Sequence, residues 1–167
     1  IDKAILFGTT PHPEHASNLH ELESELNSLN AILAGADSKQ TALRRLRQNN
    51  QKIAVTTRKY PQRFYGFGAV PLGLSPAETE EWLESEITDN GLLGLGEFTP
   101  GNDQQIMQLE VIFQALCNTK IYPVWVHTFN PVTLSGIKLL MDLCRHYCQI
   151  PVIFGHLGGS HWLEVIR

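Results

Sequence analysis

The sequence is short of several features that would mark common protein classes. It has no excess of basic residues, because 13 Lys and Arg stand against 17 Asp and Glu, for a formal net charge of −4. This balance gives no support to nucleic-acid binding by phosphate neutralisation. No apolar run approaches the roughly 20 residues of a membrane helix, and no segment reads as a signal peptide. We therefore expect a cytoplasmic protein that acts on a small molecule, without nucleic-acid or membrane partners.

Cysteine is also scarce, with residues only at Cys117, Cys144 and Cys148. An odd number of thiols in predicted helices indicates buried, unpaired side chains in a reducing compartment. The alternative is half a metal site, since Cys144 and Cys148 are four residues apart. No serine or cysteine lies in a nucleophile-elbow motif, so covalent catalysis has little support.

What the sequence does contain is a regular alternation of apolar runs and helical patterns. The runs lack internal polar alternation, which is typical of strands buried on both faces. We expect strands at 3–8, 63–70, 92–98, 122–128 and 151–156. The last four end about 30 residues apart, the size of a βαβ repeat.

The segments between these runs carry helix signals. From Ser17 a leucine stripe at intervals of three and four residues predicts one amphipathic helix. The expected helix starts are Ser38 as a cap, Ser75 with Pro76 and Glu78 as a capping box, Asn102 or Asp103 as a cap, and the pair Asn130 and Pro131.

Strands that alternate with helices predict an α/β fold with a parallel sheet. A doubly wound sheet and part of a (β/α)8 barrel both accommodate five such units. The barrel is favoured because three successive strands end in Glu97, His127 and His156, and barrel enzymes draw their catalytic groups from several strand ends. A complete barrel needs about 250 residues, so residues 1–167 are interpreted as one partial barrel domain, truncated at both ends.

Glu97, His127 and His156 are the predicted catalytic and metal-ligating residues. Neutral imidazole binds zinc, iron, nickel or manganese, and a catalytic ion needs about three protein ligands. Glu97 has three interpretations: a ligand, a general base, or a partner of an arginine at the rim. The expected cofactor is a divalent ion, zinc first, with manganese, iron or nickel as alternatives.

Further histidines lie in loops on the same predicted face of the sheet. His12 and His15 follow the first strand, and His161 follows His156. His12 and His15 are weaker candidates for contact with substrate, with a polar surface as the alternative, and His161 is a weaker candidate for contact with substrate or with a metal ligand.

These residues resemble the amidohydrolase superfamily of metal-dependent enzymes, in the branch of the aminocarboxymuconate-semialdehyde decarboxylase type. The matching segments are residues 1–7, 63–71, 91–97, 123–127 and 151–159, taken as strands two to six. The resemblance implies a distorted (β/α)8 barrel in which His127 and His156 are metal ligands. It also implies a His-x-His pair upstream of Ile1 and an Asp beyond Arg167.

The resemblance implies a metal-dependent hydrolase or lyase that uses activated water on a carbonyl-type or carboxylate substrate. Glu97 is also similar to the carboxylate of TatD-like two-metal nucleases, although residues 98–101 do not continue that motif. The third hypothesis is a non-catalytic barrel fragment. The isolated 167-residue piece is expected to be inactive, and a homo-oligomer is left open.

Overall fold

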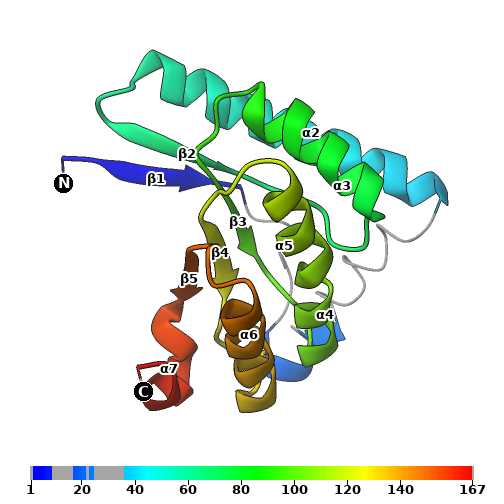
Figure 1. Ribbon diagram of the computed structural model, residues 1–167, viewed down its shortest axis with the longest axis vertical. Helices are drawn as coiled ribbons and strands as arrows, with labels where there is room; N and C mark the ends of the chain where they lie inside the picture. The colour runs from blue at the N-terminus through cyan, green and yellow to red at the C-terminus, as the bar shows by residue number, and fades with distance from the viewer. Residues whose placement is uncertain (1, 9–16, 22, 25–35, 167) are drawn as a thin grey trace.

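The computed structural model describes residues 2–8, 17–21, 23–24 and 36–166, which form a parallel sheet with helices packed against it (Figure 1). Its strands are β1 (Ala4–Phe7), β2 (Phe64–Gly68), β3 (Gly94–Phe98), β4 (Val124–His127) and β5 (Val152–Gly155). Every neighbouring pair is parallel. All five expected strands are confirmed, and each is shorter than the apolar run that predicted it.

The strand order is β1-β2-β3-β4-β5, so each strand is added on the same side of the one before it. A doubly wound sheet reverses direction at a switch point, and the described strands contain no reversal. Sequential parallel strands with helical crossovers are instead the arrangement of a (β/α)8 barrel, five strands of which are present here.

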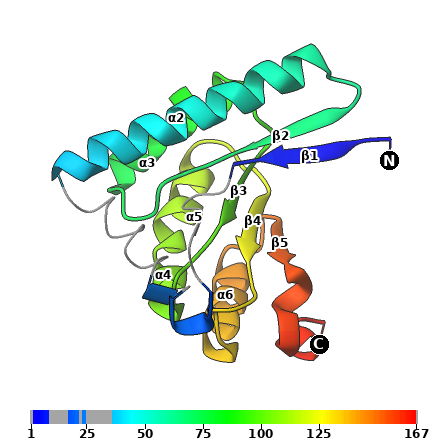
Figure 2. The same ribbon diagram turned by 180° about the vertical axis from the view of Figure 1, so that it is seen from behind.

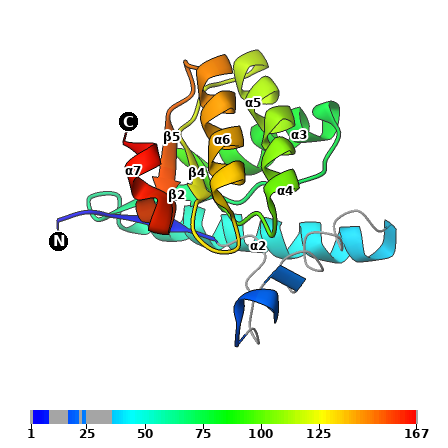
Figure 3. The same cartoon turned by 90° about the horizontal axis from the view of Figure 1, so that it is seen from below.

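Helices fill every connection between the described strands. They are α2 (Ala36–Lys59), α3 (Pro76–Trp82) with the π-helix η1 (Leu83–Thr88), α4 (Asp103–Met107), α5 (Leu109–Asn118) and α6 (Leu134–His146); η2 (His156–His161) and α7 (Trp162–Val165) follow β5. Figure 2 shows α2 running alongside β2. Seen from below, α3 to α6 lie to one side of β4 and β5, and α7 lies on the other (Figure 3).

The core lies between the sheet and these helices. Strand residues Leu95, Phe98, Val124 and Val126 are fully buried there. Apolar residues of α4 and α5 meet them, since Ile106, Leu109, Phe113 and Leu116 are also fully buried. The edge strand β1 is only half-buried, because no described strand pairs with its outer side.

Two of the expected helix starts are confirmed. Ser75 caps α3 through a complete capping box with Glu78 and with proline in the first turn. Asn102 caps α4, and its side chain accepts a hydrogen bond from the backbone N–H of Gln105. These local signals were sufficient because they satisfy orphan backbone donors without any distant partner.

The other two expected helix starts are wrong. Helix α2 begins at Ala36, two residues before Ser38. Helix α6 begins at Leu134 and is capped by Thr133, so the segment at Asn130 and Pro131 stays a loop. The loop is held by a distant residue, because the carboxylate of Asp103 accepts hydrogen bonds from the backbone N–H and the hydroxyl of Thr133.

The leucine helix expected after Ser17 lies mostly outside the described residues. Its described members 19–21 and 23–24 are helical, and Leu19 is 53% exposed. Among the residues that the structure covers, no helix is both long and apolar enough to cross a membrane.

The cysteines depart from the expectation of buried thiols. Cys117 in α5 is exposed, Cys144 in α6 is half-buried, and Cys148 is exposed. Cys148 lies two residues beyond the end of α6, so it does not share a helical face with Cys144. The interpretation of Cys144 and Cys148 as half a helical metal site is therefore wrong.

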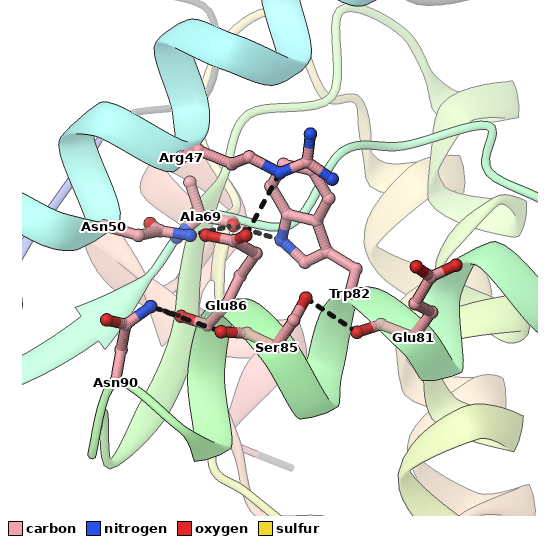
Figure 4. A network of polar contacts seen from close by, with 8 residues as sticks. All are labelled: Arg47, Asn50, Ala69, Glu81, Trp82, Ser85, Glu86 and Asn90. Carbon is pink, nitrogen blue, oxygen red and sulfur yellow. Dashed lines mark hydrogen bonds and ion pairs between the residues drawn. The ribbon is translucent and has the colours of Figure 1, made fainter.

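A buried polar network fixes the carboxyl end of β2 against α2 and α3 (Figure 4). The side-chain amide of Asn50 donates to the carbonyl of Ala69 at 3.0 Å and accepts from its N–H at 2.8 Å. Trp82 Nε1 also donates to the Ala69 carbonyl, at 3.0 Å. Arg47 pairs with Glu86 at 3.0 Å and lies over the Trp82 ring.

Candidate metal centre

Three potential ligands come together at the carboxyl ends of β3, β4 and β5. Glu97 Oε1 lies 3.3 Å from His127 Nδ1 and 3.9 Å from His156 Nε2. The two imidazole rings are 4.7 Å apart between centroids. One ligand atom from each of the three residues lies within 4.8 Å of the other two. The three residues singled out from the sequence therefore form one cluster.

Glu97 reaches this cluster because β3 carries an extra residue. Leu95 aligns with Val124 and Phe98 with Val126, so three steps along β3 match two along β4. Such a bulge re-aims the side chains that it contains. In a regular strand Glu97 would share the face of the buried Leu95. The bulge turns its carboxylate toward His127 instead, while 9% of the residue stays exposed.

Gly96 makes the bulge sterically feasible. Its φ of +124° lies in a region that side chains rarely adopt, and a Cβ there would lie 2.5 Å from the carbonyl oxygen of Trp125. The glycine before Glu97 is therefore required by the close approach of β4.

His127 is held from both of its ring nitrogens. Nε2 donates to the carbonyl of Asn130 at 3.1 Å, and Nδ1 faces the Glu97 carboxylate at 3.3 Å. Burial lowers the pKa of His127, but the hydrogen bonds to Glu97 and Asn130 and the charge of Glu97 raise it more. The net pKa lies above the ordinary 6.5.

His156 is presented by a left-handed turn directly after β5. Residues 156–159 all have positive φ, with 59° at His156 and 50° at Leu157. A non-glycine residue in this region costs about 1 kcal/mol or more, so the surrounding structure must hold the turn. The turn leaves the His156 side chain 53% exposed while its Nε2 faces Glu97.

Thr128 supplies that hold, and sequence reasoning did not single it out. The residue is fully buried, and its hydroxyl donates to the carbonyl of Gly155 and accepts from the N–H of Gly158 at 2.9 Å. The sequence signal that could have identified Thr128 is its position directly after the histidine that ends a strand. Its role could not be predicted, because it depends on the turn after β5, which the sequence pattern does not reveal.

The backbone of Gly155 packs closely against the cluster. A Cβ at this position would lie 2.8 Å from Trp125 Nε1 and 3.0 Å from Glu97 Oε1. Trp125 Nε1 is buried and has no hydrogen-bond partner among the residues that the structure describes. Because Gly155 has no side chain, Glu97 and the Trp125 indole can both pack close to its backbone.

The weaker substrate candidates do not join this group. His161 is half-buried at the end of η2 and is not among the three clustered residues. His12 and His15 lie outside the described residues, so their predicted contact with substrate stays a prediction. No cysteine belongs to a metal-competent group within the described chain.

The donor set fits a divalent transition metal. Ligands bound to one zinc ion at about 2.1 Å lie roughly 3.4 Å apart in a tetrahedral site. The separations from Glu97 are 3.3 and 3.9 Å, and all three ligand atoms lie within 4.8 Å of one another. The Nε2–H bond from His127 to a backbone carbonyl is the support that metal-ligating histidines usually have. It leaves Nδ1, which faces Glu97, as the ring nitrogen with an available lone pair.

Comparison with known proteins gives a likeness of fold. No family model and no curated protein matches the sequence. Among solved structures, 2,6-dihydroxybenzoate decarboxylase from Rhizobium matches 71% of this chain and 46% of its own, with 20% identity and a TM-score of 0.47. A 2,6-dihydroxybenzoate decarboxylase complexed with 2,6-dihydroxybenzoate matches 75% of this chain and 48% of its own, with 20% identity and a TM-score of 0.49.

This chain therefore spans about half the length of the solved structures that it matches. At such identity the likeness concerns the chain path alone. The function proposed below rests on the geometry of Glu97, His127 and His156.

Proposed function

We propose that this chain carries the metal-binding strands of a (β/α)8-barrel enzyme of the amidohydrolase superfamily, a metal-dependent hydrolase or lyase. The observation that supports this most is the convergence of Glu97, His127 and His156 from three consecutive strands. Barrel enzymes place their active sites at this end of the strands. Two imidazoles and one carboxylate are also a known ligand set of catalytic zinc sites.

In this proposal the three side chains hold a divalent ion, zinc first, with manganese, iron or nickel as alternatives. When bound, such an ion polarises a carbonyl or carboxylate oxygen and lowers the pKa of water toward neutrality. His127 is a ligand whose orientation the Asn130 carbonyl holds. Glu97 acts as a ligand, or as a base that accepts a proton through its oxygen facing both imidazoles.

The substrate proposed for the whole protein is a small molecule with a carbonyl-type or carboxylate group, acted on in the cytoplasm. The exposed side of His156 marks where such a molecule would approach, since 53% of its side chain is open to solvent. Hydrolysis and decarboxylation would both be served by an ion held at these residues, and the choice between them would depend on the substrate.

A TatD-like two-metal nuclease is the second candidate, and one observation favours it. Glu97 is a carboxylate at the end of β3 that faces both imidazoles, the residue type that two-metal sites place between their ions. Two ions per chain, both lost on Glu97→Gln, would favour the nuclease. One ion per chain favours the amidohydrolase-like enzyme.

Metal analysis of the purified whole protein that contains these residues tests the proposal. We expect stoichiometric bound metal, measured by mass spectrometry of the elements, and its loss in a His127→Ala/His156→Ala double variant. His146→Ala is the matched control, because this histidine is exposed at the end of α6 and outside the cluster. Equal metal content in the double variant and the control would contradict the proposal and favour a non-catalytic barrel fragment.

A further inference from the structure

Two exposed thiols lie on either side of one side-chain amide, away from the metal cluster. Gln149 Nε2 donates to Cys117 Sγ at 3.0 Å, and Cys148 Sγ lies 4.0 Å from Gln149 Oε1. The nitrogen and oxygen of an amide are about 2.3 Å apart, so the two sulfur atoms are separated by at most about 9 Å. The amide of Gln149 is therefore a spacer between two accessible thiols.

This proximity is maintained by the way the turn after α6 packs on α5. The Tyr147 ring meets Phe113 edge-on, with centroids 5.6 Å apart, and its hydroxyl donates to Glu110 at 3.5 Å. Glu110, Phe113 and Cys117 share one face of α5, because they follow a spacing of three and four residues. The turn thus contacts a continuous strip of α5 that ends at Cys117.

The third cysteine is set apart by its surroundings. Cys144 is half-buried and packs against the hydrophobic core. Burial raises the pKa of its thiol to about 11. Since the thiolate is the reactive form, Cys144 is a poor competitor for either exposed cysteine.

We propose that Cys117 and Cys148 form a redox-active dithiol, which a hydroperoxide closes to an intramolecular disulfide. The first thiolate attacks the peroxide, the O–O bond breaks, and a sulfenic acid and water (or an alcohol) are formed. The second thiol then displaces the sulfenic oxygen as water, and the S–S bond forms. Two thiols lose two electrons to one peroxide bond, and the Gln149 side chain swings out of the gap.

The dithiol lies at the opposite end of the strands from the metal centre. Cys117 precedes β4 and Cys148 precedes β5, whereas His127 and His156 stand at the ends of these strands. Closing the disulfide ties the turn after α6 to the end of α5. Metal content is therefore expected to stay unchanged on oxidation, so the dithiol can be tested independently of the proposed function.

The test treats the purified chain with hydrogen peroxide and maps the products after trypsin digestion under non-reducing conditions. Cleavage after Lys120, Lys138 and Arg145 places the three cysteines in three different peptides. We expect a monomer that has lost two hydrogen masses, a cross-linked peptide pair containing Cys117 and Cys148, and reversal by dithiothreitol. Cys144→Ser should leave the yield unchanged, whereas Cys117→Ser and Cys148→Ser should abolish the cross-link.

Gln149→Ala provides a second measurement, because it removes the spacer without changing a thiol. We expect faster closure in this variant at the same peroxide concentration. A cross-link between Cys144 and Cys148, disulfide-linked dimers, or oxidation of the two cysteines to separate sulfinic acids would each overturn the proposal.

Discussion

The hydroxyl of Thr128 is hydrogen-bonded on both sides of His156. It donates to the carbonyl of Gly155, directly before the histidine, and accepts from the N–H of Gly158, two residues after it. Thr128 directly follows His127 at the end of β4, so one short segment carries one imidazole and holds the turn that carries the other. The Thr128 side chain therefore links the positions of the two rings.

Thr128→Val should weaken metal binding without removing a ligand. Valine has nearly the same shape but leaves the Gly158 N–H and the Gly155 carbonyl without this partner. Loss of such a supporting group typically costs about 10–100-fold in metal affinity. Competition with a coloured chelator measures the effect. Thr128→Ser retains the hydroxyl and should bind as the unmodified protein does, and equal weakening by both variants would contradict this role.

The pKa of His127 predicts opposite pH dependences for folding and for metal binding. Without metal, the raised pKa means that the charged imidazole is stabilised in the folded state beside Glu97. That contribution is complete below the ordinary pKa of 6.5 and is lost as the pH rises through the folded-state value. Metal binding requires a neutral imidazole and should strengthen over the same interval.

Titration of the His127 ring resonances by NMR, in the metal-free protein, tests this prediction. Glu97→Gln removes the opposing charge and should move the pKa of His127 back toward its ordinary value. Thermal unfolding measured over the same pH series should lose its dependence on this group in the variant. A pKa at or below 6.5 for His127 in the unmodified protein would be the contrary result.

Gly155→Ala should disturb the cluster by volume alone. The added Cβ would lie 2.8 Å from Trp125 Nε1 and 3.0 Å from Glu97 Oε1, while the φ of −57° and ψ of 138° suit any residue. We expect displacement of Glu97 and weaker metal binding, again measured by chelator competition. Gly8→Ala is the control, because its Cβ would meet only ordinary contacts at 3.6 and 3.7 Å.

The sequence predicts the fold and the three clustered residues because both depend on repeated local signals. Five apolar runs, and a polar ligand at the end of each of three, are visible without coordinates. Sequential strand order then follows the chain, and neighbouring strand ends meet at one edge. Confirmed caps such as Ser75 are local in the same sense, since every partner lies within four residues.

What the sequence does not reveal depends on contacts between distant segments. The bulge that aims Glu97 is a mismatch in register between β3 and β4, and neither strand signals it alone. Asn130 and Pro131 have the residue types of a helix start, but Asp103 holds Thr133 in place as the cap of α6. Such a long-range hydrogen bond overrides local preferences.

Asn50→Ala should destabilise the fold, because the Asn50 side chain is fully buried and makes two hydrogen bonds to the backbone of Ala69. The variant leaves the buried Ala69 N–H without a partner and its carbonyl with Trp82 alone. Leaving a buried donor unsatisfied costs about 1–3 kcal/mol, which urea unfolding can resolve. Asn50→Asp keeps the acceptor but buries a carboxylate against the Ala69 carbonyl, so it should cost at least as much. Gln48 is exposed and lies two residues before Asn50 on α2. Gln48→Ala should therefore stay within about 0.5 kcal/mol of the unmodified protein.

Alkylation rates should separate Cys144 from the other two cysteines, and their pH dependence should identify the cause. With a pKa raised to about 11 by burial, Cys144 is a thiolate in only about one molecule in a thousand at pH 8. Its iodoacetamide rate, followed by peptide mass spectrometry, should therefore rise about tenfold per pH unit up to that value. A rate that stays low and flat with pH would instead mean that access limits the reaction, and a rate equal to that of Cys117 would contradict the burial of this thiol.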